Sequence, residues 1–415
     1  MPTFDLFAQV TRFANLIQAW KLASRGKRDR LPVARFAAEI DERLVEIQRT
    51  LKAGTWQPGA HRQFFVYDPK FRNIAAPPFA DRVVHHAICT VIEPLFERRF
   101  IFDSYACRVG KGAHLGIRRL QLFLRRKLGI TYALKCDISK FFASIHHDVL
   151  RQIIRQTIHD PKLLEVLNLI IAGYSPGIPI GNLTSQLFAN VYLDQLDHFI
   201  KEKLRIKYYL RYMDDFVILG ENKRDLTKTL DAIRAFLIET LKLTLHPRKV
   251  RLFPTRLGVD FVGYVVFPDH ILLRSKNVRH FAKKLRKQQK WLAAGKITTK
   301  ELEESVRSWI AHANHANTFG LRRKLFASAN LPAFSPVPLS TVPSGRTGHV
   351  IKTSIRTTLA PTRAKPPDPH LPASTPPAGQ LSLFGYLPGL PAPKTARRKP
   401  RVVGLRQTAG LLGKY

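Results

Sequence analysis

The sequence predicts an α/β fold: a small antiparallel sheet backed by helices, then a helical segment, then a tail rich in proline. Short apolar segments bounded by turn residues alternate with longer segments in which apolar residues recur at helical spacing. Beyond about residue 331 prolines crowd together and Asp368 is the only acidic residue. Such a tail cannot bury enough apolar surface to offset its ordering entropy, so we expect it to be disordered.

Six segments before residue 205 are predicted to be helical or extended. The helical segments are residues 4–51, 81–96, 147–173 (one helix or a pair) and 183–204, and the strand-like ones are residues 63–79 and 131–138. Prolines interrupt residues 63–79, whereas residues 131–138 are short and apolar. The second strand is therefore expected to be buried.

A β-hairpin is predicted between residues 207 and 219. The segments YYLRYM and FVIL are joined only by Asp214 and Asp215, which is the pattern of a hairpin with acids at its tip. Further on, residues 225–241 are expected to form a helix and residues 250–266 two short strands. Residues 276–325 are strongly basic with helical spacing.

The charge of the chain narrows the class of its partners. Sixty-eight Lys and Arg residues oppose 30 Asp and Glu residues, which gives a formal net charge of +38 over 415 residues. A field of that sign favours an anionic partner, and nucleic-acid phosphates are the usual one. A merely soluble basic protein is the alternative that charge alone leaves open.

The spacing of the cysteines and the hydropathy of the chain indicate where in the cell the protein is located. Cys89, Cys107 and Cys136 occur singly, so they form neither a disulfide framework nor a CxxC metal site. The first residues lack the apolar core of a signal peptide, and no uncharged apolar run reaches the roughly 18 residues that span a bilayer. We therefore expect a cytoplasmic protein with no membrane partner.

Three acidic residues end or interrupt apolar strands. Asp137 ends the segment ALKCD, and Asp214 and Asp215 join the two hairpin strands. Burying acids in apolar strands is costly unless a metal compensates them, and nucleotidyl transfer needs two divalent cations held by carboxylates. Two adjacent acids in a turn are also ordinary turn chemistry, which is the alternative for Asp214 and Asp215.

The flanking residues resemble the reverse transcriptases over roughly residues 40–330. CDISKFFASIHH resembles the first palm motif, GIPIGNLTSQLFANVYLDQLDHF the second, RYMDDFVIL the motif with two acids, LKLTLHPRKV the fourth and VDFVGYVV the primer-contacting hairpin. FRNIAAPPFADRVVHHAI and SYACRVGKGAH resemble the fingers motifs. The resemblance implies an RNA-directed DNA polymerase with a right-hand fold of fingers, palm and thumb.

This resemblance also implies a division of the chain. The N-terminal helices and fingers would take residues 1–130, and the palm, with the remaining fingers elements, residues 131–275. A helical thumb would follow at residues 276–331. The proline-rich basic tail, residues 332–415, would be disordered.

The family's chemistry is carried over residue by residue. Asp137 and Asp214 would ligate two Mg²⁺ ions directly, with Mn²⁺ as the alternative ion, and Asp215 would have a lesser role at the metal and primer end. Lys249, in HPRKV, matches the lysine proposed to protonate the pyrophosphate leaving group. An exposed surface lysine is the alternative for Lys249.

Substrate-binding residues follow from the same resemblance. Phe142 matches the steric gate that collides with a ribose 2′-hydroxyl, and its alternative is a core aromatic residue, a role better suited to Phe141. Arg72 matches the fingers arginine that grips the triphosphate, for which a planar bidentate donor suits phosphate oxygens. A solvated basic residue is the alternative for Arg72. The other predicted substrate-binding residues are Ile180, Gly181, Ser185, Gln186, Tyr212 and Met213.

Ile180 indicates a particular subgroup of the reverse transcriptases. The segment I-G-x-x-x-S-Q resembles the reverse transcriptases of diversity-generating retroelements, which copy template adenines with frequent errors. A β-branched side chain cannot hydrogen-bond the nascent base pair as Gln could. Related bacterial enzymes of phage-defence, retron-like or group II intron-like systems are the alternatives. A catalytically inactive nucleic-acid-binding scaffold is the alternative from another class.

The predicted partners are template RNA and the primer or cDNA strand. The resemblance adds a basic accessory protein. In the tail, Gln380, Leu381, Leu383 and Phe384 of the segment QLSLF resemble the motif with which bacterial proteins bind the sliding clamp. A chance apolar island is the alternative for that segment.

Overall fold

The computed structural model describes residues 5–67, 71–126, 130–331 and 334. All of them lie in one compact unit, residues 1–384, and a second unit, residues 385–415, lies outside the described residues. The predicted disordered tail, apart from residue 334, and the QLSLF segment also lie outside them. Within the described part of the chain, no helix is long and apolar enough to cross a membrane.

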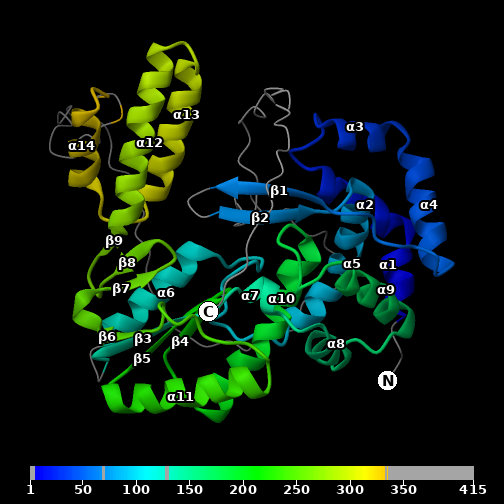
Figure 1. Ribbon diagram of the computed structural model, residues 1–415, viewed down its shortest axis with the longest axis horizontal. Helices are drawn as coiled ribbons and strands as arrows, with labels where there is room; N and C mark the ends of the chain where they lie inside the picture. The colour runs from blue at the N-terminus through cyan, green and yellow to red at the C-terminus, as the bar shows by residue number, and fades with distance from the viewer. Residues whose placement is uncertain (1–4, 68–70, 127–129, 332–333, 335–415) are drawn as a thin grey trace, which may run out of the picture. The chain divides into compact units, whose positions relative to one another are not determined.

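Helix α5 (Phe79–Glu97) is the centre of the N-terminal helices. It contacts α1 (Leu6–Thr11), α2 (Phe13–Ser24), α3 (Leu31–Ala38), α4 (Ile40–Lys52) and α10 (Leu183–His198) (Figure 1). Its buried residues occupy more than one face, because both Val83 and Val84 are fully covered. A helix that is apolar on several sides needs neighbours on several sides, which explains its place among them.

A hairpin of β1 (Arg62–Tyr67) and β2 (Phe71–Ala76) follows these helices in the chain. The two strands pair antiparallel from Arg62 opposite Ala76 to Tyr67 opposite Phe71. Only the end of β2 is buried, at Ala75 and Ala76. The hairpin is therefore held at its base and exposed along the rest of its length.

The central sheet has the strand order β4-β5-β3-β6 and is antiparallel throughout. Its strands are β3 (Tyr132–Asp137), β4 (Tyr209–Tyr212), β5 (Asp215–Gly220) and β6 (Arg251–Pro254). Leu134 and Cys136 join the core that contains α10 and α11 (Lys223–Glu239), whereas Ala133 joins a second core on the opposite face. Both faces of the sheet are thus covered, and alternate residues of one strand enter different cores.

The second core lies between the central sheet, α6 (Ala113–Arg125) and a three-stranded sheet in the order β7-β8-β9. These strands are β7 (Val259–Phe261), β8 (Tyr264–Val266) and β9 (Ile271–Leu273). The sequence predicted two strands over residues 250–266, but β6, β7 and β8 all fall there. The 3₁₀ turn Thr255–Leu257 ends β6 and lets β7 enter a different sheet.

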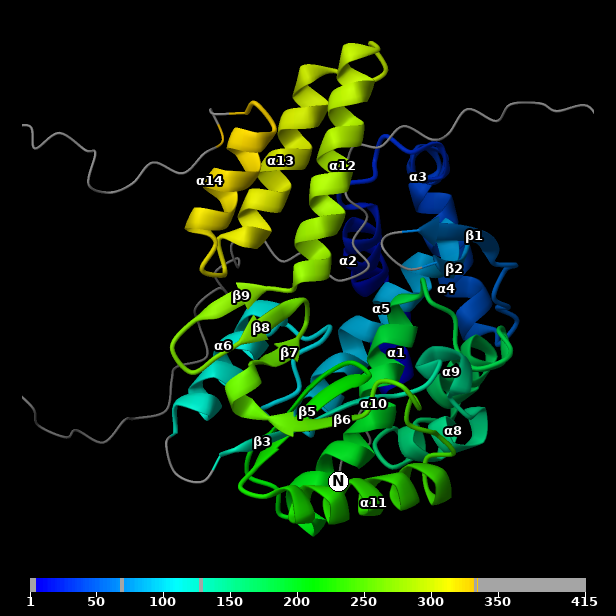
Figure 2. The same ribbon diagram turned by 60° about the vertical axis from the view of Figure 1, so that its left-hand side comes forward.

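The remaining helices fall into two groups. The first connects strands of the central sheet and consists of α7 (Phe141–Ser144), α8 (His147–Arg155), α9 (Pro161–Ala172) and the π-helix Phe199–Lys203. The second follows β9 and consists of α12 (Ser275–Ala293), α13 (Thr299–Ala313) and α14 (Phe319–Ser328), shown together in Figure 2. These last three helices share a small core of their own that includes Phe281, Val306 and Phe326.

The predicted α/β class with a small antiparallel sheet backed by helices is confirmed. Residue 130 separates α6 from β3, and residue 275 is the first residue of α12. The division into fingers, palm, thumb and tail at these residues stays a prediction.

Candidate active site

The three predicted metal-binding acids meet at one end of the central sheet. Asp137 ends β3 and faces Asp215, the first residue of β5, across the antiparallel ladder, so their side chains share one face of the sheet. Asp214 precedes β5 in the turn from β4, and its carbonyl oxygen accepts a hydrogen bond from the backbone N–H of Ile138 at 3.2 Å. The structure therefore brings Asp137, Asp214 and Asp215 together.

The hairpin tip differs from the prediction in one respect. The sequence suggested that both Asp214 and Asp215 form the tip, whereas Tyr212 pairs with Asp215 and leaves Met213 and Asp214 as the two turn residues. Met213 has a φ of 55°, in the left-handed region that tight hairpin turns require. Asp215 consequently belongs to the strand, where the ladder holds its backbone.

Two lysines contact the acids. Lys249 Nζ lies 2.5 Å from Asp137 Oδ1, and Lys135 Nζ lies 3.2 Å from Asp215 Oδ2. Lys249 is therefore not a free surface lysine, although 39% of its side chain is exposed. Each ammonium therefore partly neutralises one of the carboxylates.

Asp215 has an unusual environment for a carboxylate. Its Oδ1 is buried and has no hydrogen-bond partner among the described residues. Burial raises the pKa of Asp215 to about 6; Lys135 opposes this rise, and the neighbouring charges of Asp137 and Asp214 add to it. An unpaired buried oxygen costs roughly 1–3 kcal/mol, and a cation beside it would relieve that cost.

The donor set suits a magnesium ion, since Mg²⁺ prefers carboxylate oxygens. The described residues nevertheless contain no group of three or more His, Cys, Asp or Glu side chains arranged to hold a metal ion. Asp137 contacts Lys249 and Asp215 contacts Lys135 in this arrangement. The residues therefore fit a divalent ion once these side chains turn toward it.

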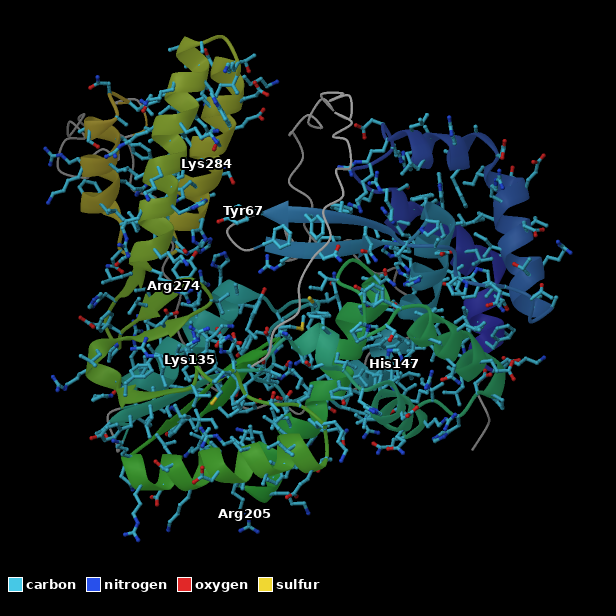
Figure 3. All side chains as sticks on the ribbon, viewed as in Figure 1. Tyr67, Lys135, His147, Arg205, Arg274 and Lys284 are labelled. Carbon is cyan, nitrogen blue, oxygen red and sulfur yellow. The ribbon has the colours of Figure 1, made fainter. Side chains whose placement is uncertain are left out.

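Lys135 also connects the acids to the next sheet. Its ammonium donates to the backbone carbonyl oxygen of Asp260 on β7 at 2.8 Å and lies 3.4 Å from the Asp260 carboxylate. Arg274, which precedes α12, donates to the same carboxylate. A chain of charges thus runs from Asp215 to the base of α12, and Figure 3 labels Lys135 and Arg274 along it.

Lys135, Asp260 and Arg274 were not predicted as functional residues from the sequence. A signal existed at Lys135, since a cation inside the apolar strand ALKCD needs a buried anion. Its partners could not be named from the sequence, because Asp260 lies 125 residues away.

Phe142 lies on α7, shortly after Asp137. Its ring is half-buried and packs against the main core, whereas Phe141 is only 2% exposed. The carbonyl oxygen of Phe142 accepts a hydrogen bond from the N–H of Ile178 at 2.9 Å. This bond places the segment 177–181 against the turn that carries Phe142.

The same segment reaches the exposed hairpin. Ala75 on β2 donates its N–H to the carbonyl oxygen of Ile180 at 3.0 Å. At Gly181, where φ is 140°, a Cβ would lie 2.5 Å from the carbonyl oxygen of Ala75. At Gly177, where φ is 68°, a Cβ would lie 2.1 Å from the carbonyl oxygen of Phe142. Only glycine allows both close approaches, and Gly177 was not among the predicted residues.

The other predicted substrate-binding residues lie on β2, α10 and β4 and in the turn after β4. Arg72 lies on β2, the strand of Ala75, and is partly exposed. Ser185 is buried and Gln186 half-buried on α10, which begins just after Gly181. Burial raises the pKa of Tyr212 to about 12, as expected for a phenol that stays neutral beside the acids.

Comparison with protein families decides the class of the domain. The model of the family "Reverse transcriptase (RNA-dependent DNA polymerase)" matches residues 67–266, which contain all three acids, Lys249 and the segment 177–181. Residues 67–266 form a reverse transcriptase domain. Such domains generally use divalent metal ions, in agreement with the donor set described above.

The reverse transcriptase domain has bacterial relatives. Protein YkfC of Escherichia coli K12 is 26% identical over 278 residues, which cover 56% of this chain and 72% of YkfC. The group II intron-encoded protein LtrA of Lactococcus lactis subsp. cremoris is 22% identical over 299 residues, covering 54% of this chain and 49% of LtrA. These relatives support a bacterial reverse transcriptase and do not single out the diversity-generating group.

Among solved structures, the chain is similar to telomerase from Candida albicans in complex with a fragment of telomeric RNA. The TM-score is 0.42 at 12% identity, with coverage of 70% of this chain and 58% of the telomerase chain. Apo telomerase from Candida tropicalis gives a TM-score of 0.41 at the same identity, covering 72% of this chain and 65% of that one.

Proposed function

We propose that this protein is an RNA-directed DNA polymerase that makes cDNA by two-metal nucleotidyl transfer. The observation that carries the proposal is the pairing of Asp137 with Asp215 across the sheet, with Asp214 in the adjoining turn, inside a reverse transcriptase domain. Template RNA and a primer or cDNA strand would be its partners, as the net charge of +38 favours.

Asp137 and Asp214 would hold two Mg²⁺ ions, with Mn²⁺ as the alternative. Bound there, the ions would activate the primer 3′-oxygen and neutralise the triphosphate. Asp215 would contribute its buried, unpaired oxygen from the strand. Lys249 would leave Asp137 and donate a proton to the departing pyrophosphate, a role that its contact at the acids supports.

Phe142, Arg72 and the segment between them would bind the incoming nucleotide. The hydrogen bonds at Ile178 and Ile180 join the turn of Phe142 to the strand of Arg72, so one continuous backbone path would position both side chains. Arg72 would grip the triphosphate, and the ring of Phe142 would exclude a ribose 2′-hydroxyl. Gln186, Ser185, Tyr212 and Met213 would complete the pocket.

Basic helix α12 supports duplex binding. It begins at Ser275 and carries Lys and Arg through most of its turns, including Lys284, which Figure 3 labels. Positive charge along one helix is the arrangement that tracks a phosphate backbone. Thumb contact with the template–primer duplex is the role that we assign to it.

We further infer an error-prone enzyme of the diversity-generating type, because Ile180 offers no side-chain hydrogen bond to a nascent base pair. Ile180→Gln is expected to lower misincorporation opposite template adenine, measured by sequencing the cDNA. Leu183→Gln, at a half-buried position on the neighbouring helix, is the control. An adenine error rate that stays the same in Ile180→Gln would contradict this reason for the subtype. The accessory protein, the cytoplasmic location and the sliding-clamp motif also stay predictions.

The function is tested by primer extension on an RNA template with Mg²⁺. Asp214→Asn is expected to lower the extension rate by about 100-fold or more, because it removes a metal ligand, while RNA binding changes little. Asp231→Asn, at an exposed position of α11, is the matched control and should extend normally. A wild-type protein that binds RNA without extending a primer would instead favour the inactive scaffold.

A further inference from the structure

Arg211 lies on β4, two residues before the turn that carries Asp214. Neither its side chain nor that of its partner Asp197 has any exposed surface. Arg211 Nε donates to Asp197 Oδ1 at 2.7 Å, and Nη2 donates to Asp197 Oδ2 at 2.6 Å. This is a bidentate, fully desolvated ion pair beneath the hairpin.

The rest of the guanidinium is also engaged. Nη1 donates to the carbonyl oxygen of Met213 at 3.1 Å and to Asn190 Oδ1 at 3.2 Å, and Nη2 donates to Ser104 Oγ at 3.1 Å. All five N–H donors of an arginine are therefore directed at acceptors. One of those acceptors belongs to the turn itself.

Neighbouring residues also form hydrogen bonds with Asp197 and with the backbone of Arg211. Tyr209 donates its hydroxyl to Asp197 Oδ1 at 2.5 Å, and Asp197 belongs to α10. The N–H of Arg211 donates to the carbonyl oxygen of Asp103 at 2.9 Å, and the N–H of Tyr105 donates back to the carbonyl oxygen of Arg211 at 3.0 Å. These hydrogen bonds fix the position from which the guanidinium contacts the turn.

The backbone conformation of Met213 requires support from its surroundings. Its φ of 55° is unfavourable for a residue with a side chain, and the peptide after it leads directly to Asp214. Orienting the Met213 carbonyl oxygen toward Arg211 fixes that peptide plane. Rotation of the plane would move the Asp214 backbone and, with it, the carboxylate.

Stability is a weak explanation for this network. Replacing a buried ion pair by apolar residues of similar volume is often neutral or stabilising. A neutral residue at position 211 would, however, lose the charged donor to the turn. We propose that Arg211 is a positioning residue that, through the carbonyl oxygen of Met213, sets the place of Asp214 for metal binding. This inference rests on the proposed role of Asp214.

The test uses Arg211→Lys, which keeps the charge but lacks the planar fork needed to reach Asp197 and Met213 together. The first readout is the Kd of Mn²⁺ for the full-length protein, measured by electron paramagnetic resonance. We expect the Kd to rise about 10-fold or more, as when a supporting partner of metal ligands is lost. The second is the Mg²⁺ concentration that gives half-maximal primer extension, which should rise in parallel while the Kd for primer–template stays within about twofold.

Arg108→Lys is the matched control. Arg108 is also buried and paired, with Glu97 at 2.6 Å, and it also donates to the backbone carbonyl oxygens of Ile101 and Ser104. It shares Ser104 with Arg211, which contacts the hydroxyl of that residue, but it does not contact the turn. Its replacement should lower the melting temperature to a similar extent and leave both metal readouts at the wild-type value. An unchanged Mn²⁺ Kd in Arg211→Lys, or an equal change in both variants, would overturn the proposal.

The Mn²⁺ measurement separates this proposal from the proposed function. A wild-type protein that binds Mn²⁺ but does not extend primers would refute the polymerase assignment, and the comparison of the two arginine variants would still test the positioning role. A wild-type protein that extends primers and an Arg211→Lys variant with unaltered metal dependence would refute the positioning role alone.

Discussion

Phe142 and Phe141 show how neighbouring residues of one type take different roles. Phe141 is 2% exposed and belongs to the main core, whereas Phe142 only packs against that core from its edge. The backbone carbonyl oxygen of Phe142 accepts a hydrogen bond from Ile178, and its ring packs edge-on against the ring of Phe141 with the centroids 5.5 Å apart. Phe142 is only partly buried, so its place at the edge of the core is compatible with contact to a substrate.

At the residue scale, Phe142→Ala is expected to let ribonucleotides compete with deoxynucleotides, since the collision with the 2′-hydroxyl disappears. The measurement is the ratio of kcat/KM for rNTP and dNTP, which should rise by about 10-fold or more. Phe141→Ala is the control: it should cost roughly 3–5 kcal/mol of stability, as for other buried phenylalanines, and leave the ratio unchanged. Equal ratios in both variants would place the gate elsewhere.

At the scale of elements, the β7–β8 hairpin is attached to the central sheet by charge as well as by apolar packing. Phe261 and Tyr264 pack in the second core. Asp260 accepts hydrogen bonds from the side chains of both Lys135 and Arg274. The attachment reaches Asp215 through Lys135. The position of the hairpin and the charge at the acids are therefore linked.

Asp260→Asn is expected to weaken this link, because the amide cannot neutralise Lys135 and Arg274. We expect a loss of roughly 1–3 kcal/mol in unfolding free energy and a higher Kd for primer–template, measured by denaturant titration and by fluorescence anisotropy. Asp269→Asn, in the exposed turn before β9, should change neither. Tighter or unaltered primer–template binding by Asp260→Asn would show that the hairpin is placed by apolar packing alone.

At the scale of the whole molecule, His85 joins α5 to α10. It is fully buried, and its Nδ1 lies 2.8 Å from Thr184 Oγ1. Burial, together with the charges of His61, His86 and Arg82, lowers the pKa of His85 to about 3. The folded protein therefore keeps this ring neutral over the ordinary pH range.

Stability should fall as the solution is acidified below the ordinary histidine pKa of 6.5. Only the unfolded chain takes up a proton at position 85 between that value and about 3, so the folded state loses about 2 kcal/mol from His85 by pH 5. The measurement is unfolding free energy at pH 7 and pH 5 for the wild type and His85→Gln.

The His85→Gln variant should show a smaller difference between the two pH values, with a residual slope from groups that include His86 and His114, whose pKa values burial lowers to about 4. His159→Gln, at an exposed position, should keep the wild-type difference. A pH dependence that is the same in all three proteins would contradict the buried neutral histidine.

Local patterns in the sequence were sufficient for β3, the hairpin of β4 and β5, the acids and the family, but not for the third strand within residues 250–266 or for β9. Short apolar segments identify β3 and β5, and Asp137, Asp214 and Asp215 stand out because acids in apolar strands are rare. The roles of Phe142 and Ile180 were predicted from the resemblance to reverse transcriptase motifs. These features depend on residues that are close in the chain, so the order of side chains is enough to predict them.

Only the tertiary structure decided which side chains meet. Asp260 reaches Lys135 from 125 residues away, Ser104 reaches Arg211 from 107, and the backbone of Ala75 meets Ile180 and Gly181. Lys135 and Arg211 are charged residues within apolar strands, so each needs a partner of opposite charge. The sequence alone does not identify those partners. The partners depend on the direction of each side chain and on how separate elements pack, and neither is encoded in local spacing.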